Sequence, residues 1–262
     1  MLVDLIFIVG GNGLAGSAIV RYAKLHNLEY DVIQRQNKES FFGKSCDVLI
    51  FANGNPLKYK ANQDPYFDFK ASVESVSEYI HKINFKKFVL ISTIDVYDKK
   101  SKLEFTLEDR KINTDYLQPY GYDKLLAENY VRHFCDEYLI FRLSGLTGIG
   151  LKKNPAFDFI DKDSKVMISP ESELNFINTR LVADSIFKIL DEKISNQTFN
   201  LASKNSIKIR DIKKIIRYDS EYTKDSKNFI QNYQINTEKI QKYVELSSSE
   251  EALSEYFLSL QN

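Results

Sequence analysis

Four glycines within seven residues place the strongest constraint on how this chain folds. They lie in Gly10-Gly-Asn-Gly13-Leu-Ala-Gly16, after an apolar run at 2–9 and before a stretch of helical spacing at 14–25. Glycine permits a tight turn with positive φ, and the following helix presents its first N–H groups to an anion. Between a strand and a helix, this pattern predicts a site for the pyrophosphate of a dinucleotide. The alternative is a plain tight turn.

The first half of the chain alternates between two hydrophobic periods. Short apolar runs rich in β-branched residues predict buried strands, and apolar positions at helical spacing predict helices. The further strands are expected at 29–34, 47–51, 87–92 and 139–143, and the further helices at 65–84 and 120–134. This alternation predicts an α/β fold with a Rossmann-type, doubly wound parallel sheet.

The rhythm changes after residue 145. Residues 145–178 read as irregular, a helix is expected at 180–190, and a strand at 197–201. Ser247-x-x-Glu250 predicts a capping box before a terminal helix at 252–260. We therefore expect a dinucleotide-binding domain at 1–145, to which 179–203 return. Residues 146–178 and 204–262 would form a small C-terminal substrate-binding lobe.

Composition excludes several classes of protein. The 262 residues are 43% hydrophobic and carry 36 basic and 36 acidic side chains. A chain of this length can bury a large core, and the balanced charge argues against a nucleic-acid binder. Two distant cysteines suit a reducing compartment, no spacing suggests a metal site, and no apolar run is long enough for a membrane span. We expect a soluble, cytoplasmic protein.

The end of the second predicted strand bears on the choice of cofactor. NAD sites usually place an acidic residue there to bind the ribose hydroxyl, whereas this chain has Gln34 followed by Arg35. An arginine can pair with the 2′-phosphate of NADP. The sequence therefore favours NADP(H), with NAD(H) as the alternative. A solvated surface arginine is the structural alternative.

Tyr120 and Lys124 stand four residues apart on one predicted helix. A nearby ammonium is expected to lower the pKa of the phenol, which could then exchange a proton with a carbonyl or alcohol. Tyr66 and Lys70 have the same spacing, so the spacing alone also occurs in this chain by chance. Only Tyr120 follows a strand that ends in a hydroxyl, Thr93, and reactive groups gather at the carboxyl ends of parallel strands.

These motifs resemble the extended short-chain dehydrogenases/reductases, the nucleotide-sugar epimerase/dehydratase family. The resemblance covers nearly the whole chain. It is carried by the glycine turn, Asp47-Val-Leu-Ile-Phe-Ala52, Ser92-Thr93-x-x-Val96-Tyr97, Pro119-Tyr120-Gly-Tyr-Asp-Lys124, Phe141-Arg142-Leu143, Phe176-Ile177 and Phe199-Asn200-Leu201.

The resemblance implies roles for individual residues. Thr93, Tyr120 and Lys124 would form a catalytic triad in which Lys124 also holds the nicotinamide ribose. The implied cofactor-binding residues are Gly10, Asn12, Gly13, Leu14, Gly16, Arg35, Phe51, Ala52, Asn53 and Lys124. The candidates for substrate binding are Asp95, Tyr97, Asn154 and Arg180.

The residues after Thr93 and the link at 36–46 bear on which branch of the family the chain resembles. A 4,6-dehydratase would carry Asp-Glu after the threonine, where this chain has Ile94 and Asp95, and the 36–46 link is too short for the usual helix and extra strand. The first feature argues against dehydration. The short link, Arg35 and the stretches Leu139-Ile-Phe-Arg142 and Ile235-Asn-Thr-Glu-Lys239 resemble the 4-ketoreductase branch, which includes dTDP-4-dehydrorhamnose reductases. The expected function is NADP(H)-dependent reduction of the C4 ketone of a nucleoside-diphosphate 4-keto-6-deoxy sugar.

Two alternatives stay open. One is an NAD-dependent nucleotide-sugar 4-epimerase or dehydratase, and the other is a non-catalytic NADP(H)-binding sensor or partner protein. The expected partner is a small sugar nucleotide, with neither nucleic acid nor a membrane. A homodimer is also expected, because the helices at 65–84 and 119–134 match the pair that often forms the interface in this family.

Overall fold

The computed structural model describes residues 5–55, 57–161, 163–216 and 220–261, in two compact units. The first unit comprises the chain up to Asp98, Lys111–Arg142 and Val182–Phe199. The second comprises Lys99–Arg110, Leu143–Leu181 and the chain from Asn200 onward. The domain prediction kept 99–110, 143–145, 179–181 and 200–203 with the dinucleotide-binding part, whereas their contacts group them with the second unit.

The first unit alternates strands and helices along the chain. Its elements, some of which end just beyond it, are β1 (Ile6–Val9), α1 (Leu14–Leu25), β2 (Tyr30–Ile33), the 3₁₀ turn η1 (Lys38–Phe41), β3 (Ser45–Phe51), α2 (Lys58–Gln63), α3 (Pro65–Phe69), the π-helical turn η2 (Lys70–Glu74), α4 (Ser75–Lys82), β4 (Asn84–Thr93), the 3₁₀ turn η3 (Ile94–Val96), α5 (Pro119–Phe134), β5 (Tyr138–Leu143), α7 (Thr179–Asp191) and β9 (Gln197–Leu201).

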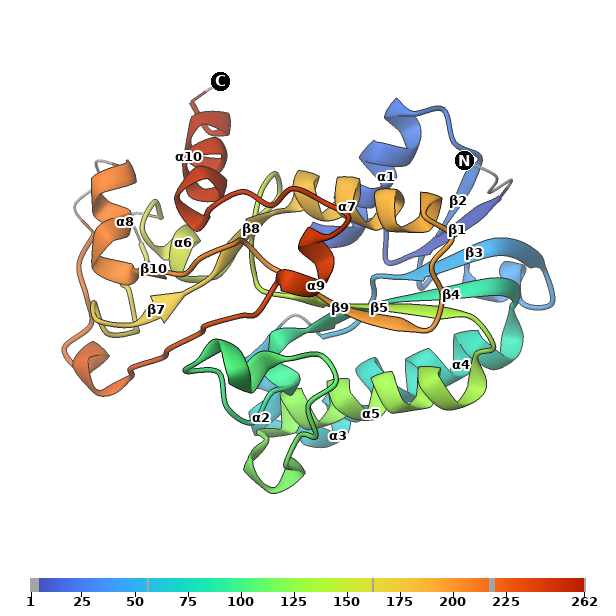
Figure 1. Ribbon diagram of the computed structural model, residues 1–262, viewed down its shortest axis with the longest axis horizontal. Helices are drawn as coiled ribbons and strands as arrows, with labels where there is room; N and C mark the ends of the chain where they lie inside the picture. Colours follow the sequence, from blue (N-terminus) through green and yellow to red (C-terminus); the bar gives the residue numbers. More distant parts are fainter. Residues whose placement is uncertain (1–4, 56, 162, 217–219, 262) are drawn as a thin grey trace. The chain divides into compact units, whose positions relative to one another are not determined.

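These strands form one sheet in the order β2-β1-β3-β4-β5-β9. The β1–β2, β1–β3 and β3–β4 pairs are parallel, so their carboxyl ends lie at one edge. Helices α4 and α5 cover one face, and α1 and α7 cover the other, where Tyr22 stacks on Phe187 with ring centroids 4.3 Å apart (Figure 1). The predicted Rossmann-type, doubly wound sheet is confirmed.

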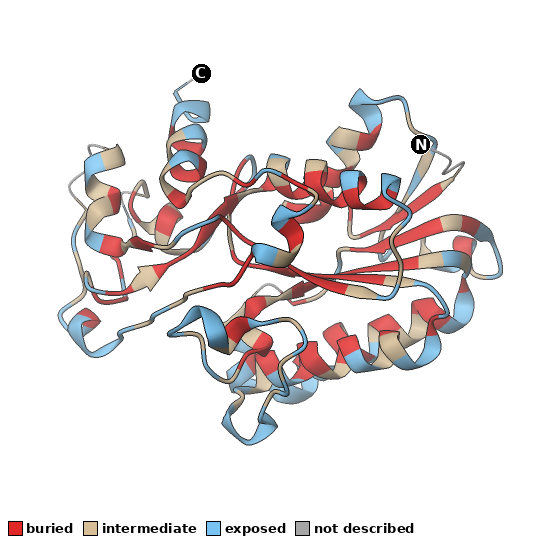
Figure 2. Ribbon diagram, viewed as in Figure 1, coloured by how far each residue is buried: buried red, intermediate tan, exposed pale blue. Residues whose placement is uncertain are grey.

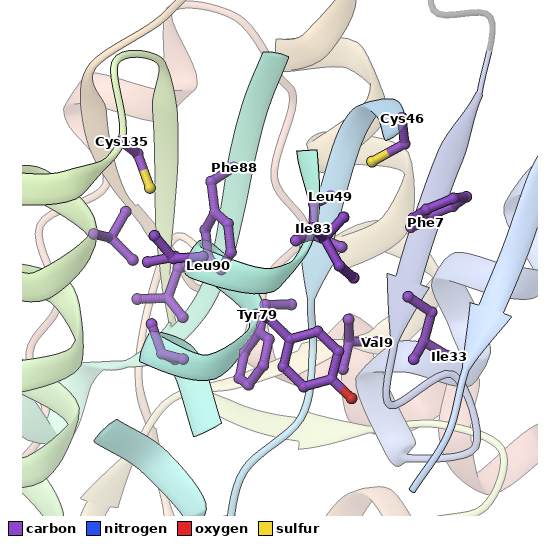
Figure 3. Packing of buried hydrophobic residues seen from close by; sticks show 14 of the residues in the cluster. Phe7, Val9, Ile33, Cys46, Leu49, Tyr79, Ile83, Phe88, Leu90 and Cys135 are labelled. Carbon is purple, nitrogen blue, oxygen red and sulfur yellow. The ribbon is translucent and has the colours of Figure 1, made fainter. Parts of the chain in front are cut away.

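The core of this unit lies between the sheet and α4. Strand residues that point to this face, such as Phe7, Leu49 and Phe88, meet Tyr79 and Ile83 at the end of α4 (Figure 3). Strands β1, β3, β5 and β9 are buried along most of their length, whereas the helices alternate between buried and exposed faces (Figure 2). This pattern explains the near-continuous apolar runs of the strands.

The helix expected at 65–84 is one run of three segments. A π-helical turn at Lys70–Glu74 joins α3 to α4, and it buries Ser72 and Val73. Such a turn accommodates one extra residue without ending the helix, so the periodicity survives it. In the link at 36–46 the structure has only η1, as its shortness predicted.

The second unit is built from short elements. They are the 3₁₀ turn η4 (Leu103–Thr106), β6 (Gly145–Thr147), α6 (Pro155–Asp158), β7 (Glu173–Leu174), β8 (Phe176–Asn178), β10 (Ile207–Lys208), α8 (Ile209–Ile216), η6 (Ser226–Asn228), α9 (Glu238–Gln241) and α10 (Ser249–Ser259). Strand β6 pairs with β8 in parallel, and β10 pairs with β7 in antiparallel orientation. Strands of two or three residues are too short to show a hydrophobic alternation in the sequence. For this reason the sequence predicts an irregular region here.

Buried asparagines hold the second unit together. The Asn200 amide donates to the carbonyls of Thr106 at 2.6 Å and of Asn236 at 2.9 Å. Asn175 likewise donates to the carbonyls of Ser203 and Asn205. Because buried backbone carbonyls need donors, Asn200 ties the 99–110 segment to this unit.

The last helix begins at Ser249, earlier than the predicted 252, and its capping box lies one residue later than predicted. The capping box is formed by Ser248 and Glu251, not by Ser247 and Glu250. The Ser248 hydroxyl accepts from the Glu251 amide at 3.1 Å, and the Glu251 carboxylate accepts from the Ser248 amide at 2.6 Å. The run of three serines and two glutamates fits the capping-box motif starting at either Ser247 or Ser248. The sequence alone therefore does not distinguish the two registers. Within the described ranges, no helix has both the length and the apolar character needed to cross a membrane.

Candidate functional site

The glycine turn closes as its sequence predicts. Gly10 has φ 79°, and a β-carbon there would lie 3.0 Å from the backbone of Ala52 and Asn53. A β-carbon on Gly16 would overlap the Gly10 carbonyl oxygen. The Gly13 amide donates to that same oxygen at 2.9 Å. Side chains at 10 and 16 are therefore excluded by close backbone approach, which is what a dinucleotide turn requires.

The open side of this turn presents unpaired helix amides. Gly13 is the N-cap of α1 and offers no side chain to the first-turn N–H groups, and no acidic residue lies in that turn. Asn12 and Gly13 are exposed, and Leu14 is half-buried. The helix N-terminus therefore carries a partial positive charge that a phosphate can reach.

Two polar side chains follow the end of β2. Arg35 is exposed, and it forms no hydrogen bond or ion pair with any residue that the structure describes. The amide nitrogen of Gln34 is buried and has no partner among these residues. A buried donor without an acceptor is costly, and a bound ribose would supply one. This orphaned donor and the glycine cradle fit a dinucleotide.

The end of β3 borders the candidate cofactor site mainly with backbone atoms and less with side chains. Phe51 is only 1% exposed and packs in the core, so its side chain cannot line a cofactor surface. Ala52 is half-buried and its backbone lies against Gly10. Asn53 is exposed, and its amide approaches the Ser75 hydroxyl at 3.5 Å.

The structure brings Thr93 and Tyr120 together. Thr93 ends β4, and its hydroxyl accepts from the Asp95 amide at 3.2 Å in the turn η3. Tyr120 opens α5, is half-buried, and is hydrogen-bonded to Thr93. Contact between these elements requires Gly121, because a β-carbon there would overlap the Asp95 carbonyl oxygen. Two hydroxyls thus converge beside the carboxyl edge of the sheet.

The acidity of Tyr120 differs from the expectation. Burial raises its pKa above the usual value, and the negative charges of Asp95 and Asp68 raise it further. Lys58 and the hydrogen bond with Thr93 oppose this shift. Lys124, whose Nζ lies 5.7 Å from the Tyr120 ring centroid, does not contribute. The net shift of this pKa is therefore upward, opposite in direction to the expected effect of Lys124.

Lys124 is instead surrounded by carboxyl groups and a glycine. It is 9% exposed, and its Nζ would stand 2.5 Å from a β-carbon on Gly54. Burial lowers the pKa of the Lys124 ammonium, while the charges of Asp68 and Asp123 act in the opposite direction. Gly54 therefore leaves room for the ammonium at the end of β3.

Four residues of this site escaped the sequence reasoning. Asp68 of α3 and Asp123 of α5 lie beside Lys124, and Asn55 donates to the Asp68 carboxylate at 3.0 Å. Lys58 of α2 forms an ion pair with Asp95 at 2.8 Å. Asp123 was visible as the residue before Lys124. For Asp68 and Lys58 the sequence held no signal, because their contacts span long separations.

The four predicted substrate residues have different environments. Asp95 lies close enough to Tyr120 for its charge to raise the pKa of that phenol. Tyr97 is 1% exposed, and its hydroxyl accepts from Arg142 at 2.8 Å, so it is a core residue that a sugar cannot reach. This placement corrects the prediction for Tyr97, since aromatic residues at strand ends more often pack.

Asn154 and Arg180 belong to the second unit. The Asn154 carboxamide caps α6 by accepting from the Phe157 amide at 3.0 Å, and it donates to the Leu146 carbonyl at 2.7 Å. Arg180 is exposed and pairs with Glu255 at 3.1 Å. Both side chains therefore have structural partners within their own unit.

The second tyrosine–lysine match serves as a control. Tyr66 is 72% exposed, and the Lys70 Nζ lies over its ring at 5.3 Å on the surface. Among the described residues, no hydroxyl group is hydrogen-bonded to Tyr66 as Thr93 is to Tyr120. No group of three or more histidine, cysteine or acidic side chains there could hold a metal ion.

One segment of the chain matches the model of a protein family. Residues 71–158 match the model of the NAD dependent epimerase/dehydratase family. This segment contains Thr93, Tyr120 and Lys124, so the resemblance found in the sequence is confirmed over it. No curated protein matched the chain.

Solved structures share the fold across the whole chain. A dTDP-4-dehydrorhamnose reductase from Clostridium acetobutylicum is 20% identical with a TM-score of 0.80, over 98% of this chain and 100% of that one. A second such reductase, from Bacillus anthracis in complex with NADP, is 14% identical with a TM-score of 0.78, over 99% of each chain.

An epimerase is equally similar in fold. A UDP-glucuronic acid 4-epimerase from Bacillus cereus, in complex with UDP-4-deoxy-4-fluoro-glucuronic acid and NAD, is 17% identical. Its TM-score is 0.77, over 98% of this chain and 99% of that one.

Proposed function

We propose that this chain is an NADP(H)-dependent reductase of the NAD dependent epimerase/dehydratase family, acting on the C4 ketone of a nucleoside-diphosphate 4-keto-6-deoxy sugar. The observation that carries the proposal is the hydrogen-bonded pair of Thr93 and Tyr120, with Lys124 one turn further along α5. The glycine turn of the same unit supplies the place for the dinucleotide. The structural likeness to both reductases and epimerases supports nucleotide-sugar chemistry as the broader class.

The residues present suit a bound dinucleotide. Gly10, Gly13 and Gly16 would admit the pyrophosphate at the start of α1, and Arg35 would pair with a 2′-phosphate. Lys124, beside Gly54, would contact the nicotinamide ribose. When bound, the cofactor supplies the hydride for the reduction.

The protein's own groups handle the proton. The neutral Tyr120 hydroxyl donates its proton to the C4 oxygen as negative charge develops there, and the Thr93 hydroxyl hydrogen-bonds the same oxygen. Burial keeps Tyr120 protonated at neutral pH, and a protonated phenol is the state that reduction requires.

The test is cofactor identity followed by turnover. The purified protein is denatured, any released dinucleotide is identified, and the emptied protein is titrated with NADPH and NADH. The reductase predicts an empty site that prefers NADPH, and oxidation of NADPH when a dTDP- or UDP-linked 4-keto-6-deoxy sugar is added. Retained NAD at one per chain, with interconversion of C4 epimers and no net cofactor use, would overturn it in favour of the epimerase.

We also propose a homodimer through the outer faces of α3, α4 and α5. Exposed aromatic side chains gather on these helices, including Tyr66, Phe69, Tyr122 and Phe134. Large exposed apolar surfaces often mark protein interfaces. Light scattering should give twice the 30.4 kDa mass of the chain, and Tyr122→Glu should shift the protein toward the monomer. A monomer at micromolar concentration would contradict this interface.

A further inference from the structure

Two buried carboxyl groups beside Lys124 have no part in the proposed proton transfer. Asp68 of α3 has no exposed surface and Asp123 of α5 has 6%. Their carboxyl groups lie within hydrogen-bond distance of each other. The Oδ2 atom of each is buried and reached by no donor among the described residues. Two carboxylates in such contact repel strongly, and one shared proton removes the repulsion.

The remaining neighbours hold this pair in place and supply one positive charge. Asn55 donates to Asp68 Oδ1 at 3.0 Å and also to the Leu57 carbonyl at 3.1 Å, so Asp68 is held in place. Lys124 is the positive group that acts on both carboxyls. With one shared proton, the pair carries a single negative charge, which balances the charge of the Lys124 ammonium.

Other charged and titratable groups of the packed elements have different partners. Helices α2 and α3 both contact α5. On α2, Lys58 pairs with Asp95, and Lys60 lies over the Phe67 ring at 3.9 Å. On α5, the charge of Asp68 raises the pKa of Tyr120, whose hydrogen-bond partner is Thr93. On the outer side of the pair, Tyr66, Tyr59 and Tyr122 are exposed.

Asp123 also borders the surface. It lines an open cavity of about 440 Å³ together with Tyr66, Phe69 and Tyr122. Asp123 therefore has Lys124 and Asp68 on its inner side and this cavity on the other.

We propose that Asp68 and Asp123 share one proton and act together as a positioning pair for Lys124. With the proton, the three groups have no net charge and the ammonium is free to turn toward a bound ribose. Without it, two carboxylates hold the ammonium and their net charge with Lys124 is negative. The inference rests on the proposed function in one respect, the contact between Lys124 and the cofactor.

The expected working range follows from the same contacts. Burial, together with the charge and hydrogen bond of Asp68, raises the pKa of the Asp123 carboxyl to about 6. The pair therefore loses its shared proton as the pH rises through this value. Cofactor affinity should fall over the same range, by at most about tenfold per pH unit for one linked proton.

The pair is tested first in the free protein, independently of any cofactor. Carbon-13 NMR of aspartate-labelled protein, recorded from pH 4 to 8, should show the Asp123 carboxyl signal change near pH 6. Asp68→Asn and Asp123→Asn should each abolish that step, whereas the exposed control Asp115→Asn should leave it in place. Two carboxyls that titrate independently below pH 5 would overturn the shared proton.

The effect on Lys124 is tested by NADPH binding across the same pH range. Wild-type protein should bind several-fold more weakly at pH 7.5 than at pH 5.5, with proton uptake on binding measured in buffers of different ionisation enthalpy. Asp123→Asn should bind with little pH dependence, and Asp115→Asn should match the wild type. The same pH dependence in Asp123→Asn as in the wild type would refute the positioning role.

The two proposals fail in distinguishable ways. If NADPH does not bind at any pH, the proposed function is wrong, and the NMR titration still decides whether the proton is shared. If NADPH binds and no carboxyl titrates near pH 6, the function stands and the pair is refuted.

Discussion

The Asp95 carbonyl oxygen occupies the position that a β-carbon on Gly121 would take. This contact seats the turn after β4 against the first turn of α5 and so brings Thr93 to Tyr120. The glycine that follows the tyrosine is therefore a packing requirement of the site. It has no contact with substrate in the proposed mechanism.

Gly121→Ala should separate the two hydroxyls. The added methyl group must push α5 away from η3, and a displacement near 1 Å at a reacting group can reduce the rate about 100-fold. Overpacking should also lower stability by about 1–3 kcal/mol. Turnover of NADPH and thermal unfolding would be measured together, with Asn129→Ala on the exposed face of α5 as the control. Unchanged turnover in the alanine variant would show that this contact does not position Tyr120.

Tyr120→Phe should remove the proton donor and leave the cofactor site intact. General acid catalysis typically contributes 10²–10⁴-fold, so kcat should fall by about that factor while NADPH affinity stays near the wild-type value. Tyr66→Phe is the matched control, because it changes the other tyrosine that precedes a lysine by four residues. Turnover would be followed by the loss of NADPH absorbance. A near-normal rate in Tyr120→Phe would remove this tyrosine from the mechanism.

Sequence reasoning predicted the parts of the site whose chemistry is local. The glycine turn needs only neighbouring residues, and its context between a strand and a helix identified it. Thr93 and Tyr120 could be paired because parallel strands place their carboxyl ends at one edge. The sheet itself followed from apolar runs long enough to show their period.

Contacts between residues far apart in the sequence could not be predicted from the sequence. The Asp68–Asp123 contact joins two helices 55 residues apart, and neither residue has a partner visible in its own segment. The direction of the Tyr120 pKa shift was mistaken for a related reason. Helical spacing gave the separation from Lys124, but burial and the charges of Asp95 and Asp68 depend on the fold.

Arg35→Ala should change which dinucleotide binds. The exposed guanidinium has no partner among the described residues, so it is available to a 2′-phosphate, and charge-assisted bonds of this kind contribute about 1.5–3 kcal/mol. The Kd for NADPH should rise by roughly ten- to a hundredfold, and that for NADH should change little. Arg21→Ala on the exposed side of α1 is the control. Equal losses for both dinucleotides would show that Arg35 does not read the 2′-phosphate.

The buried carboxyls should make stability fall between pH 5 and pH 8. The pKa of Asp123 is raised from 3.8 to about 6, so the folded protein retains a proton that the unfolded chain has already released. That contribution is complete below pH 4 and is lost as the pH rises through 6; its upper size is about 3 kcal/mol. Asp158 of α6 has a pKa raised to about 6 by burial and should act in the same direction.

Amide substitutions separate the two groups. In Asp123→Asn the new amide can donate to the Asp68 carboxylate at every pH, so the drop in Tm between pH 5 and pH 8 should shrink by several degrees, since about 1 kcal/mol moves Tm by 2–4 °C in a chain of this size. Asp158→Asn should shrink it separately, and the double variant by the sum, because the sites lie in different units. Glu128, whose pKa is lowered chiefly by Arg142 against the effect of burial, stays ionised over this range and adds no slope. Calorimetry at the two pH values measures all four proteins, and a Tm drop in Asp123→Asn as large as in the wild type would mean that Asp123 carries no proton in the folded chain.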